Sequence, residues 1–345
     1  MFKAFKPNKA KQIDYVSIFR EHICVDLKRP QDWQKVEPTF QRMAGLRNNF
    51  VWDDITRSEL FNNPQMRVVQ DNVEEYIRYC IFLSTKFKFG KQGVKNFKSD
   101  WMMAWSESKV NSDQMVFEII NMLYNYTVLN FNQAVIFLKS GSSKNDYKGS
   151  LEKLRYAKWG AQEMINMIEE LQRTMQLPFE LRPDSLSFLL GLCEGMSYLC
   201  FYYMFEDGSN PAVTGENLAS LEKEVAKWFF VCRQSLKSSK DLKKIMAELY
   251  PDILSLYYTY NYNCLLRTIG EVGKKHEAEK TKGYIGAQYA YMLEAQQLIK
   301  QMKDDDKFPD KDSLKARFAR EIEPLMFPTS EKINQVYKCP IPKGD

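Results

Sequence analysis

Side chains that could act as nucleophiles, bases or metal ligands are scattered along this chain of 345 residues. Histidine occurs only at His22 and His276, and His276 lies in a solvated Lys/Glu segment. The seven cysteines lie mostly within apolar helical patterns, at Cys24, Cys80, Cys193, Cys200, Cys232, Cys264 and Cys339. Zinc sites and disulfide frameworks need closely spaced pairs or an even count, so neither is indicated. Buried free thiols in a reducing cytosol are the simplest interpretation.

Catalytic motifs do not occur in the sequence either. It contains no GxxxxGK[ST], GxGxxG, GxSxG or HExxH pattern. The acidic runs at 169–170 and 304–306 are more simply exposed charge than acid/base pairs or metal ligands. We therefore expect no enzymatic activity, no metal and no cofactor, which leaves a binding scaffold.

A segment rich in lysine and phenylalanine, KFKFGKQGVKNFK at 86–98, is a candidate membrane contact. Its lysines precede the next acidic residue, Asp100, and are Lys86, Lys88, Lys91, Lys95 and Lys98. Alternation at 86–89, followed by two glycines, predicts a strand and a turn. The lysines could contact acidic lipid headgroups. A solvated hairpin with inward-packed aromatics is the simpler interpretation, because charge runs are usually solvated faces.

The apolar run at 185–205, SLSFLLGLCEGMSYLCFYYMF, carries one formal charge, Glu194. A helix that is apolar on every face is either buried or crosses a membrane. Glu194, the serines and tyrosines, and the absence of a second such run favour a buried helix. Composition agrees, because 44% hydrophobic and 27% charged residues are ordinary for a soluble globular protein. The net charge of +5 is too small for a nucleic-acid binder, and the N-terminus has no apolar segment typical of a secretory signal.

The elements that must position these residues are mostly helices. Few glycines and prolines and many large side chains favour long helices. We expect them at about 14–24, 32–49, 65–85, 113–140, 147–176, 185–205, 214–236, 251–280, 284–303 and 313–323. An extended tail should follow from Pro328, because its prolines oppose a helix. The expected fold is all-α, a solenoid of tetratricopeptide-like antiparallel helix hairpins, with one or two small β-hairpins in the first 110 residues.

Several motifs, in order, resemble those of one family. Phe5-Lys6 ahead of Ile13-Asp14 is similar to its FK pair and VD-capped helix, and the segment 86–89 to its KFPF. Trp105-Ser106-Glu107 is similar to its W-x-D. Residues 115–117 fall where the family has VLFN, with Glu118 in place of the Asn, and Ile120 and Asn121 in place of small alanines. Pro183-Asp184, the segment 193–197 and the tail 336–342 match its proline-aspartate start, its AQAQE and its IY-x-x-x-VP.

The family that these motifs resemble is the BRO domain family of ALIX-like endosomal adaptors, and the chain would be a divergent member. The resemblance implies one boomerang-shaped BRO-like domain over 1–345. Its parts would be N-terminal helices and a β-hairpin (1–110), a helical solenoid core (111–303), and a C-terminal helix with an extended tail (304–345). Members often continue beyond this domain, so we expect a fragment of a longer protein.

The resemblance also implies a function. Members bind the C-terminal amphipathic helix of an ESCRT-III subunit, a charged multivesicular body protein, in a hydrophobic groove. The chain would then be a cytoplasmic scaffold recruited to endosomal or plasma membrane in multivesicular body sorting and membrane remodelling. The groove residues map onto Arg155, Leu199, Leu221 and either Asn217 or Leu218, and a family phosphotyrosine site onto Tyr337.

Other interpretations remain open. Leucines at such positions are by default core residues, and an arginine is by default a surface charge. The alternatives for the whole chain are a peripheral membrane-binding module, acting through the 86–98 segment, and an unrelated tetratricopeptide-like scaffold that binds no ESCRT-III tail.

Overall fold

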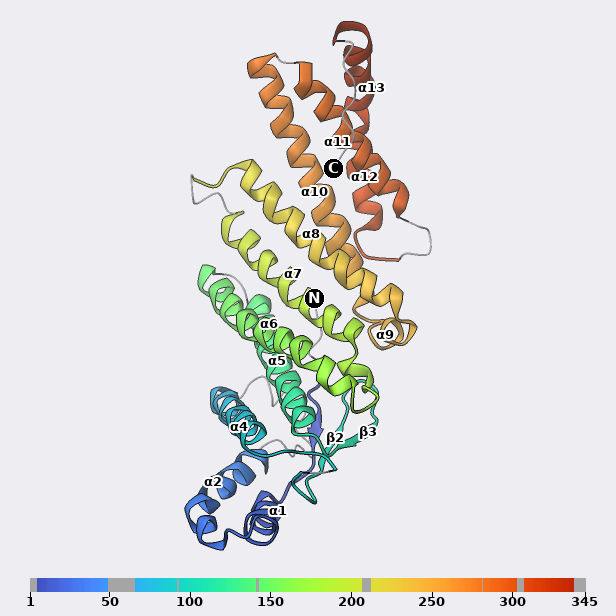
Figure 1. Ribbon diagram of the computed structural model, residues 1–345. Helices are drawn as coiled ribbons and strands as arrows, with labels where there is room; N and C mark the ends of the chain where they lie inside the picture. Colours follow the sequence, from blue (N-terminus) through green and yellow to red (C-terminus); the bar gives the residue numbers. More distant parts are fainter. Residues whose placement is uncertain are drawn as a thin grey trace. The chain divides into compact units, whose positions relative to one another are not determined.

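The chain folds mostly as α-helices with one small sheet (Figure 1). The structure, a computed structural model, describes residues 5–48, 66–91, 93–140, 143–206, 212–280, 282–302 and 307–337. The helices are α1 (Tyr15–Glu21), α2 (Pro30–Asn48), α4 (Met66–Lys86), α5 (Met115–Ser140), α6 (Lys144–Gln172), α7 (Pro183–Phe205), α8 (Gly215–Ser238), α9 (Lys240–Ile245), α10 (Tyr250–Glu279), α11 (Lys282–Gln301), α12 (Lys311–Glu321) and α13 (Glu323–Glu331). Shorter elements are η1 (His22–Asp26), η2 (Phe179–Leu181), η3 (Lys332–Tyr337), β1 (Lys9–Ala10), β2 (Ser99–Met102) and β3 (Lys109–Ser112). The predicted helical fold with a small N-terminal hairpin is confirmed.

The chain divides into two compact units. The N-terminal unit contains Lys3–Ser140 and Gly149–Leu190. The C-terminal unit contains Gly141–Lys148 and Gly191–Asp345. Helices α6 and α7 therefore contribute residues to both units.

In the N-terminal unit the strands form an antiparallel sheet in the order β1-β2-β3. Trp101 in its central strand pairs with Ala10 on one side and Val110 on the other. The strand predicted at 86–89 was wrong, because Lys86 ends α4 and the next residues form an irregular segment. Phe87 and Phe89 pack against Phe19 of α1, with ring centroids at 5.2 and 6.3 Å, instead of facing a partner strand.

Asparagines on α5 fix the N-terminal segment in place. The Asn8 amide nitrogen Nδ2 donates to Asn121 Oδ1 at 2.9 Å, and its backbone N donates to Asn125 Oδ1 at 2.7 Å. The Asn132 side chain likewise accepts a hydrogen bond from Phe5 N and donates one to Phe5 O. These polar side chains are buried, and burial without partners would be costly. The bonds therefore explain why a very apolar helix carries a row of asparagines.

A fully buried ion pair lies where α2, α4, α5 and β2 meet. Arg47 Nε is 2.7 Å from Glu118 Oε1, and both side chains are inaccessible to solvent. Glu118 also accepts hydrogen bonds from Tyr76 Oη and Trp101 Nε1, each at 2.7 Å, and from Ser99 Oγ. The Arg47 guanidinium stacks over the Trp101 ring, 4.5 Å from its centroid. Glu118 is thus compensated by several partners, whereas the Arg47 charge depends on Glu118 and the Trp101 ring.

In the C-terminal unit α10 is the central helix, packing against α8 on one side and α11 on the other (Figure 1). It ends at Glu279, and the capping residue Lys280 has a left-handed backbone (φ 50°). The short connection makes α10 and α11 an antiparallel hairpin, as the sequence predicted. Thr214 caps α8 as expected, because its hydroxyl accepts from Asn217 N and the Asn217 side chain accepts from Thr214 N.

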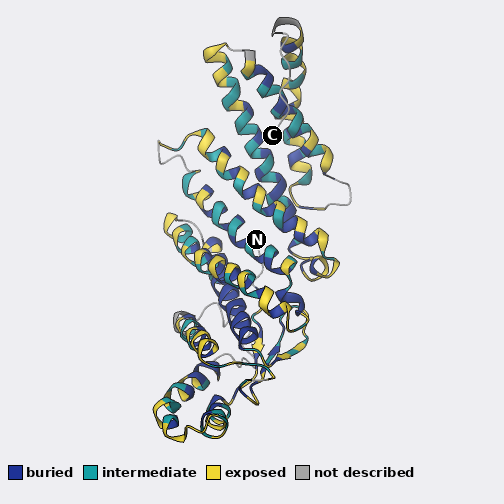
Figure 2. Ribbon diagram, viewed as in Figure 1, coloured by how far each residue is buried: buried dark blue, intermediate teal, exposed yellow. Residues whose placement is uncertain are grey.

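Helix α7 is the apolar run of 185–205. Of the helices in the described ranges, it alone has the length and composition of a membrane span. Yet 56% of its most apolar window is buried, and Figure 2 shows it largely in buried and intermediate colours. Leu186, Phe188, Leu189 and Leu192 are completely inaccessible. These burials support the interpretation of α7 as a core helix.

The extended tail predicted from Pro328 was wrong for the described residues. Helix α13 runs through Pro328 to Glu331 and continues into the π-helical turn η3, which ends at Tyr337. Pro324 stands at the start of α13, where a missing N–H costs nothing. The remainder of the tail, 338–345, lies outside the described residues.

Candidate partner-binding surface

Helices α7 and α8 approach each other closely at two glycines one turn apart. A Cβ on Gly191 would stand 2.9 Å from Cys232 Sγ, and one on Gly195 would stand 3.1 Å from the Phe229 ring. Larger residues at either position would force the helices apart. The glycines therefore allow the α7 backbone to lie directly against α8.

Further along α7 a partly buried polar network fixes the register of the two helices. Arg267 of α10 places Nε 3.0 Å from Glu222 Oε1 of α8 and donates from Nη2 to Tyr202 Oη of α7 at 3.3 Å. Burial raises the pKa of Glu222 and of Tyr202, and the Arg267 charge opposes the rise for Glu222. Tyr202 donates in turn to Glu206 at 2.7 Å, and its ring meets Tyr260 edge-on.

This register places the predicted leucines of α8 beside the C-terminal half of α7. Gly191 lies opposite Cys232, Gly195 opposite Phe229, and Tyr202 opposite Glu222, so the helices are antiparallel. Leu221 then lies level with Phe201 and Tyr202, and Leu218 lies one turn nearer the end of α7. Both leucines are half-buried, so each keeps an accessible apolar edge.

Leu199, the predicted α7 contact, is only 6% exposed and is mainly a core residue. The accessible apolar surface of this part of α7 comes instead from two aromatic neighbours. Phe201 is 38% exposed and Tyr198 is half-buried, with their ring centroids 6.5 Å apart. Sequence reasoning missed both, although their spacing of three residues already put them on one helix face, distinct from that of Leu199. We name Tyr198, Phe201, Leu218 and Leu221 the α7/α8 apolar strip.

The other residues mapped from the family resemblance have different surroundings. Asn217 is occupied as a capping residue of α8, which leaves Leu218 as the apolar candidate. Arg155 is exposed on α6 in the N-terminal unit, with its guanidinium over the Tyr156 ring at 5.1 Å. Tyr337 is the last residue of η3. For Arg155 and Tyr337, contact with a partner stays a prediction.

The five lysines of the 86–98 segment are all exposed in the N-terminal unit. Lys95 Nζ lies 3.0 Å from Asp26 Oδ1, and Lys86 lies over the Phe82 ring. The phenylalanines of the segment face inward, since Phe89 also meets Phe97 edge-on at 4.9 Å. The aromatics therefore pack as the simpler interpretation expected, and among the described residues of the segment the exposed side chains are the lysines and Asn96.

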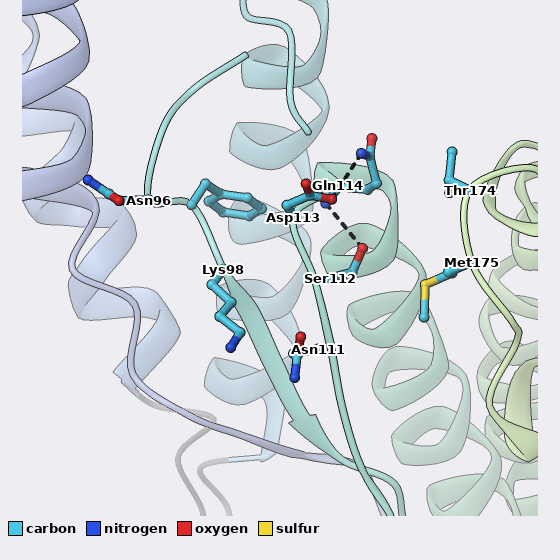
Figure 3. Close-up of a pocket in the computed structure, with 9 residues that line it drawn as sticks. Asn96, Lys98, Asn111, Ser112, Asp113, Gln114, Thr174 and Met175 are labelled. Atoms are coloured by element: carbon cyan, nitrogen blue, oxygen red, sulfur yellow. Dashed lines mark hydrogen bonds between the residues drawn. The ribbon is translucent and has the colours of Figure 1, made fainter. Parts of the chain in front are cut away.

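A polar pocket of about 530 Å³ lies next to this segment in the N-terminal unit (Figure 3). Its lining is Asn96, Phe97, Lys98, Asn111, Ser112, Asp113, Gln114, Thr174 and Met175. Several of the polar groups bond each other, because Gln114 donates from its backbone to Ser112 Oγ and from its side chain to Asp113. With one lysine and one aspartate, the lining has no excess of charge that would select an ion.

The described residues also bear on catalytic chemistry. The cysteines among them are free thiols, buried or half-buried. Burial raises the pKa of the Cys264 thiol to about 11 and that of the Cys232 thiol well above its ordinary value, so neither forms a thiolate nucleophile. Within the described ranges no three His, Cys, Asp or Glu residues gather as metal ligands. The main chemical feature of the α7/α8 strip is accessible apolar surface.

Comparison with known proteins gives one family and several solved structures, three of which are described below. Residues 3–343 match the family described as BRO1-like domain. The ALIX BRO1–CHMP4C complex aligns with a TM-score of 0.68 at 14% identity, over 99% of this chain and 90% of that one. ALIX bound to the SIVmac239 PYKEVTEDL late domain gives the same score and identity over 99% of this chain, but 46% of that longer chain.

A third structure, described as the basis for endosomal targeting by the Bro1 domain, aligns with a TM-score of 0.64. Its identity is 15%, over 99% of this chain and 88% of that one. No curated protein matches the chain by sequence. At such identities the three structures establish the shared helical fold.

Proposed function

Because the chain belongs to the BRO1-like domain family, we propose that it is an adaptor that binds the C-terminal amphipathic helix of an ESCRT-III subunit. Domains of this family are adaptors rather than enzymes, and the chain is accordingly a binding module. Two neighbours support the proposal: an ALIX BRO1 domain in complex with CHMP4C, and a Bro1 domain connected with endosomal targeting. Because the chain belongs to this family, the alternative of an unrelated tetratricopeptide-like scaffold no longer applies.

The α7/α8 apolar strip is the observation that carries the proposal. An amphipathic helix binds by laying residues spaced three and four apart into an apolar groove between scaffold helices. Leu218 and Leu221 on α8 have this spacing, and so do Tyr198 and Phe201 on α7. The close approach at Gly191 and Gly195 holds the two rows together. Four accessible apolar side chains in two parallel rows suit one helix face.

The cellular role follows from this partner. ESCRT-III subunits assemble on membranes, so a scaffold that binds their C-terminal helices works in the cytoplasm at the endosomal membrane, in multivesicular body sorting. Recruitment to the plasma membrane would require the same interaction there. Arg155, exposed in the N-terminal unit, is a separate candidate for a charge contact with an acidic partner, of the modest strength typical of exposed pairs.

Binding of a full-length ESCRT-III subunit, with and without its C-terminal helix, tests the proposal. The purified chain should retain the intact subunit in a pull-down and fail to retain the truncated one. Equal retention of both would place the contact elsewhere on the subunit. If the chain retains neither form, the ESCRT-III subunit is not its partner.

A further inference from the structure

The turn between α1 and α2 exposes two branched apolar side chains. Val25 is 64% exposed and Leu27 is 44% exposed, and they are separated only by Asp26. Lys28, in the left-handed region at φ 54°, and Arg29 follow them and are also exposed. Single exposed apolar residues are ordinary on soluble proteins. Here, however, two of them lie at one turn with basic residues directly beside them.

The lysine-rich segment lies against this turn, although 56 residues (30–85) separate the two in sequence (Figure 1). Lys95 Nζ is 3.0 Å from Asp26 Oδ1, and Asn96 Nδ2 donates to Glu21 Oε2 at 3.1 Å. The Phe87 ring meets the His22 ring edge-on at 5.7 Å. These contacts hold the two segments together as one surface of the N-terminal unit.

Positive charge is concentrated on this surface. Segments 20–29 and 86–98 contain eight basic residues: Arg20, Lys28, Arg29, Lys86, Lys88, Lys91, Lys95 and Lys98. Their only carboxylates are Glu21 and Asp26, and each bonds a residue of the lysine-rich segment. Eight basic and two acidic residues leave the two segments with a clear excess of positive charge, and Asp113, which lines a pocket with Lys98, is a further carboxylate beside them.

We propose that this surface binds an anionic lipid bilayer, with Val25 and Leu27 inserted beneath the headgroups and the lysines on the lipid phosphates. An exposed apolar turn flanked by cations suits the bilayer interface, where apolar contact and headgroup attraction add together. The rings of Phe87, Phe89 and Phe97 pack inward, and this packing fixes the backbone of the segment that carries the lysines. The proposal assigns new residues to membrane contact and is independent of helix binding by the α7/α8 strip.

Vesicle flotation tests the proposal, with phosphatidylcholine alone and with phosphatidylcholine plus phosphatidylserine. The wild-type chain should float only with the anionic vesicles, and less at high salt. The Lys88→Gln/Lys91→Gln variant should lose about fivefold in partitioning for each lysine removed. The Val25→Asn/Leu27→Asn variant should lose about tenfold, because it keeps the charge and removes the apolar contact. A matched control is Leu325→Asn, which replaces an exposed leucine on α13 (47% exposed) and should float as the wild type does.

Insertion itself has a separate signal. In the Val25→Trp variant, anionic vesicles should add a blue-shifted component to the emission, absent from the wild type, that brominated lipids quench. Each asparagine variant should keep the wild-type melting temperature, because the replaced side chains are already exposed. The proposal is overturned if the wild-type chain does not bind anionic vesicles. It is also overturned if the Val25→Asn/Leu27→Asn variant floats with them as well as the wild type does. Binding of this surface to an acidic protein in the absence of any vesicle binding would likewise overturn it.

Discussion

Glu118 and Asn121 of α5 show how single residues adapt this chain. The family motif that the sequence resembles has an asparagine and a small alanine at these positions. Here Glu118 neutralises the buried Arg47, and Asn121 accepts a hydrogen bond from Asn8 of the N-terminal segment. Each departure has a buried partner elsewhere in the same unit. We conclude that each departing residue and its buried partner belong together, since either one without the other would be destabilising.

Replacing Glu118 by Asn should therefore destabilise this protein. The variant leaves the Arg47 charge buried without its counterion, and we expect a loss of about 3–5 kcal/mol in the free energy of unfolding. The double variant Arg47→Met/Glu118→Asn removes both charges and should recover much of the loss. Urea denaturation of the wild type, the single variant and the double variant measures the loss and its recovery. If the double variant is no more stable than the single one, the ion pair does not account for the effect.

Phe201 is the second residue whose role can be measured alone. It belongs to the α7/α8 strip and is already 38% exposed, so truncation should leave the fold intact. We expect Phe201→Ala to weaken binding of an ESCRT-III C-terminal helix about tenfold, as central aromatic contacts commonly do. Phe327→Ala on α13, at an even more exposed phenylalanine, is the control and should bind normally. Equal affinities of the two variants, measured by fluorescence anisotropy, would place Phe201 outside the interface.

At the scale of elements, the α7–α8 contact depends on glycine. Gly195→Val would press a branched side chain into the Phe229 ring, and we expect a loss of about 1–3 kcal/mol in stability together with weaker helix binding. Gly270→Ala on α10 is the matched control, because no atom lies within 4 Å of its new Cβ. It should gain up to about 1 kcal/mol from helix propensity. Thermal unfolding of both variants decides the matter, and a Gly195→Val protein as stable as the wild type would contradict the close packing.

Most helices were predictable from sequence because their signals are local. Periodic apolar residues placed most helices to within a few residues, and Asp14 and Thr214, at two of the predicted helix starts, cap those helices in the structure. The segment at 86–89 alternates like a strand, yet its phenylalanines pack around Phe19, a contact that no local pattern reveals. The tail was misjudged because prolines near a helix start are tolerated, and Pro328 adds one irregularity rather than a stop.

For the molecule as a whole, the family could be recognised from ordered motifs, whereas the details of the binding surface could not. A motif maps positions along a helix, but whether a side chain is accessible depends on which neighbour covers it. Leu199 was chosen by its position and is buried, whereas Phe201, two residues later, is accessible. Leu218 and Leu221 also came from the family's motif positions, and they keep an accessible edge because each is only half-buried on α8.

Titration of the purified chain with a labelled ESCRT-III C-terminal helix, comparing the wild type with Leu221→Asp, tests the central claim most directly. A charge at Leu221 would be buried against the apolar face of the incoming helix, so binding should fall below detection while the fold is kept. Leu325→Asp, also a half-exposed leucine but on α13, should bind as the wild type does. If a folded Leu221→Asp protein binds the helix undiminished, the α7/α8 strip is not the helix-binding surface.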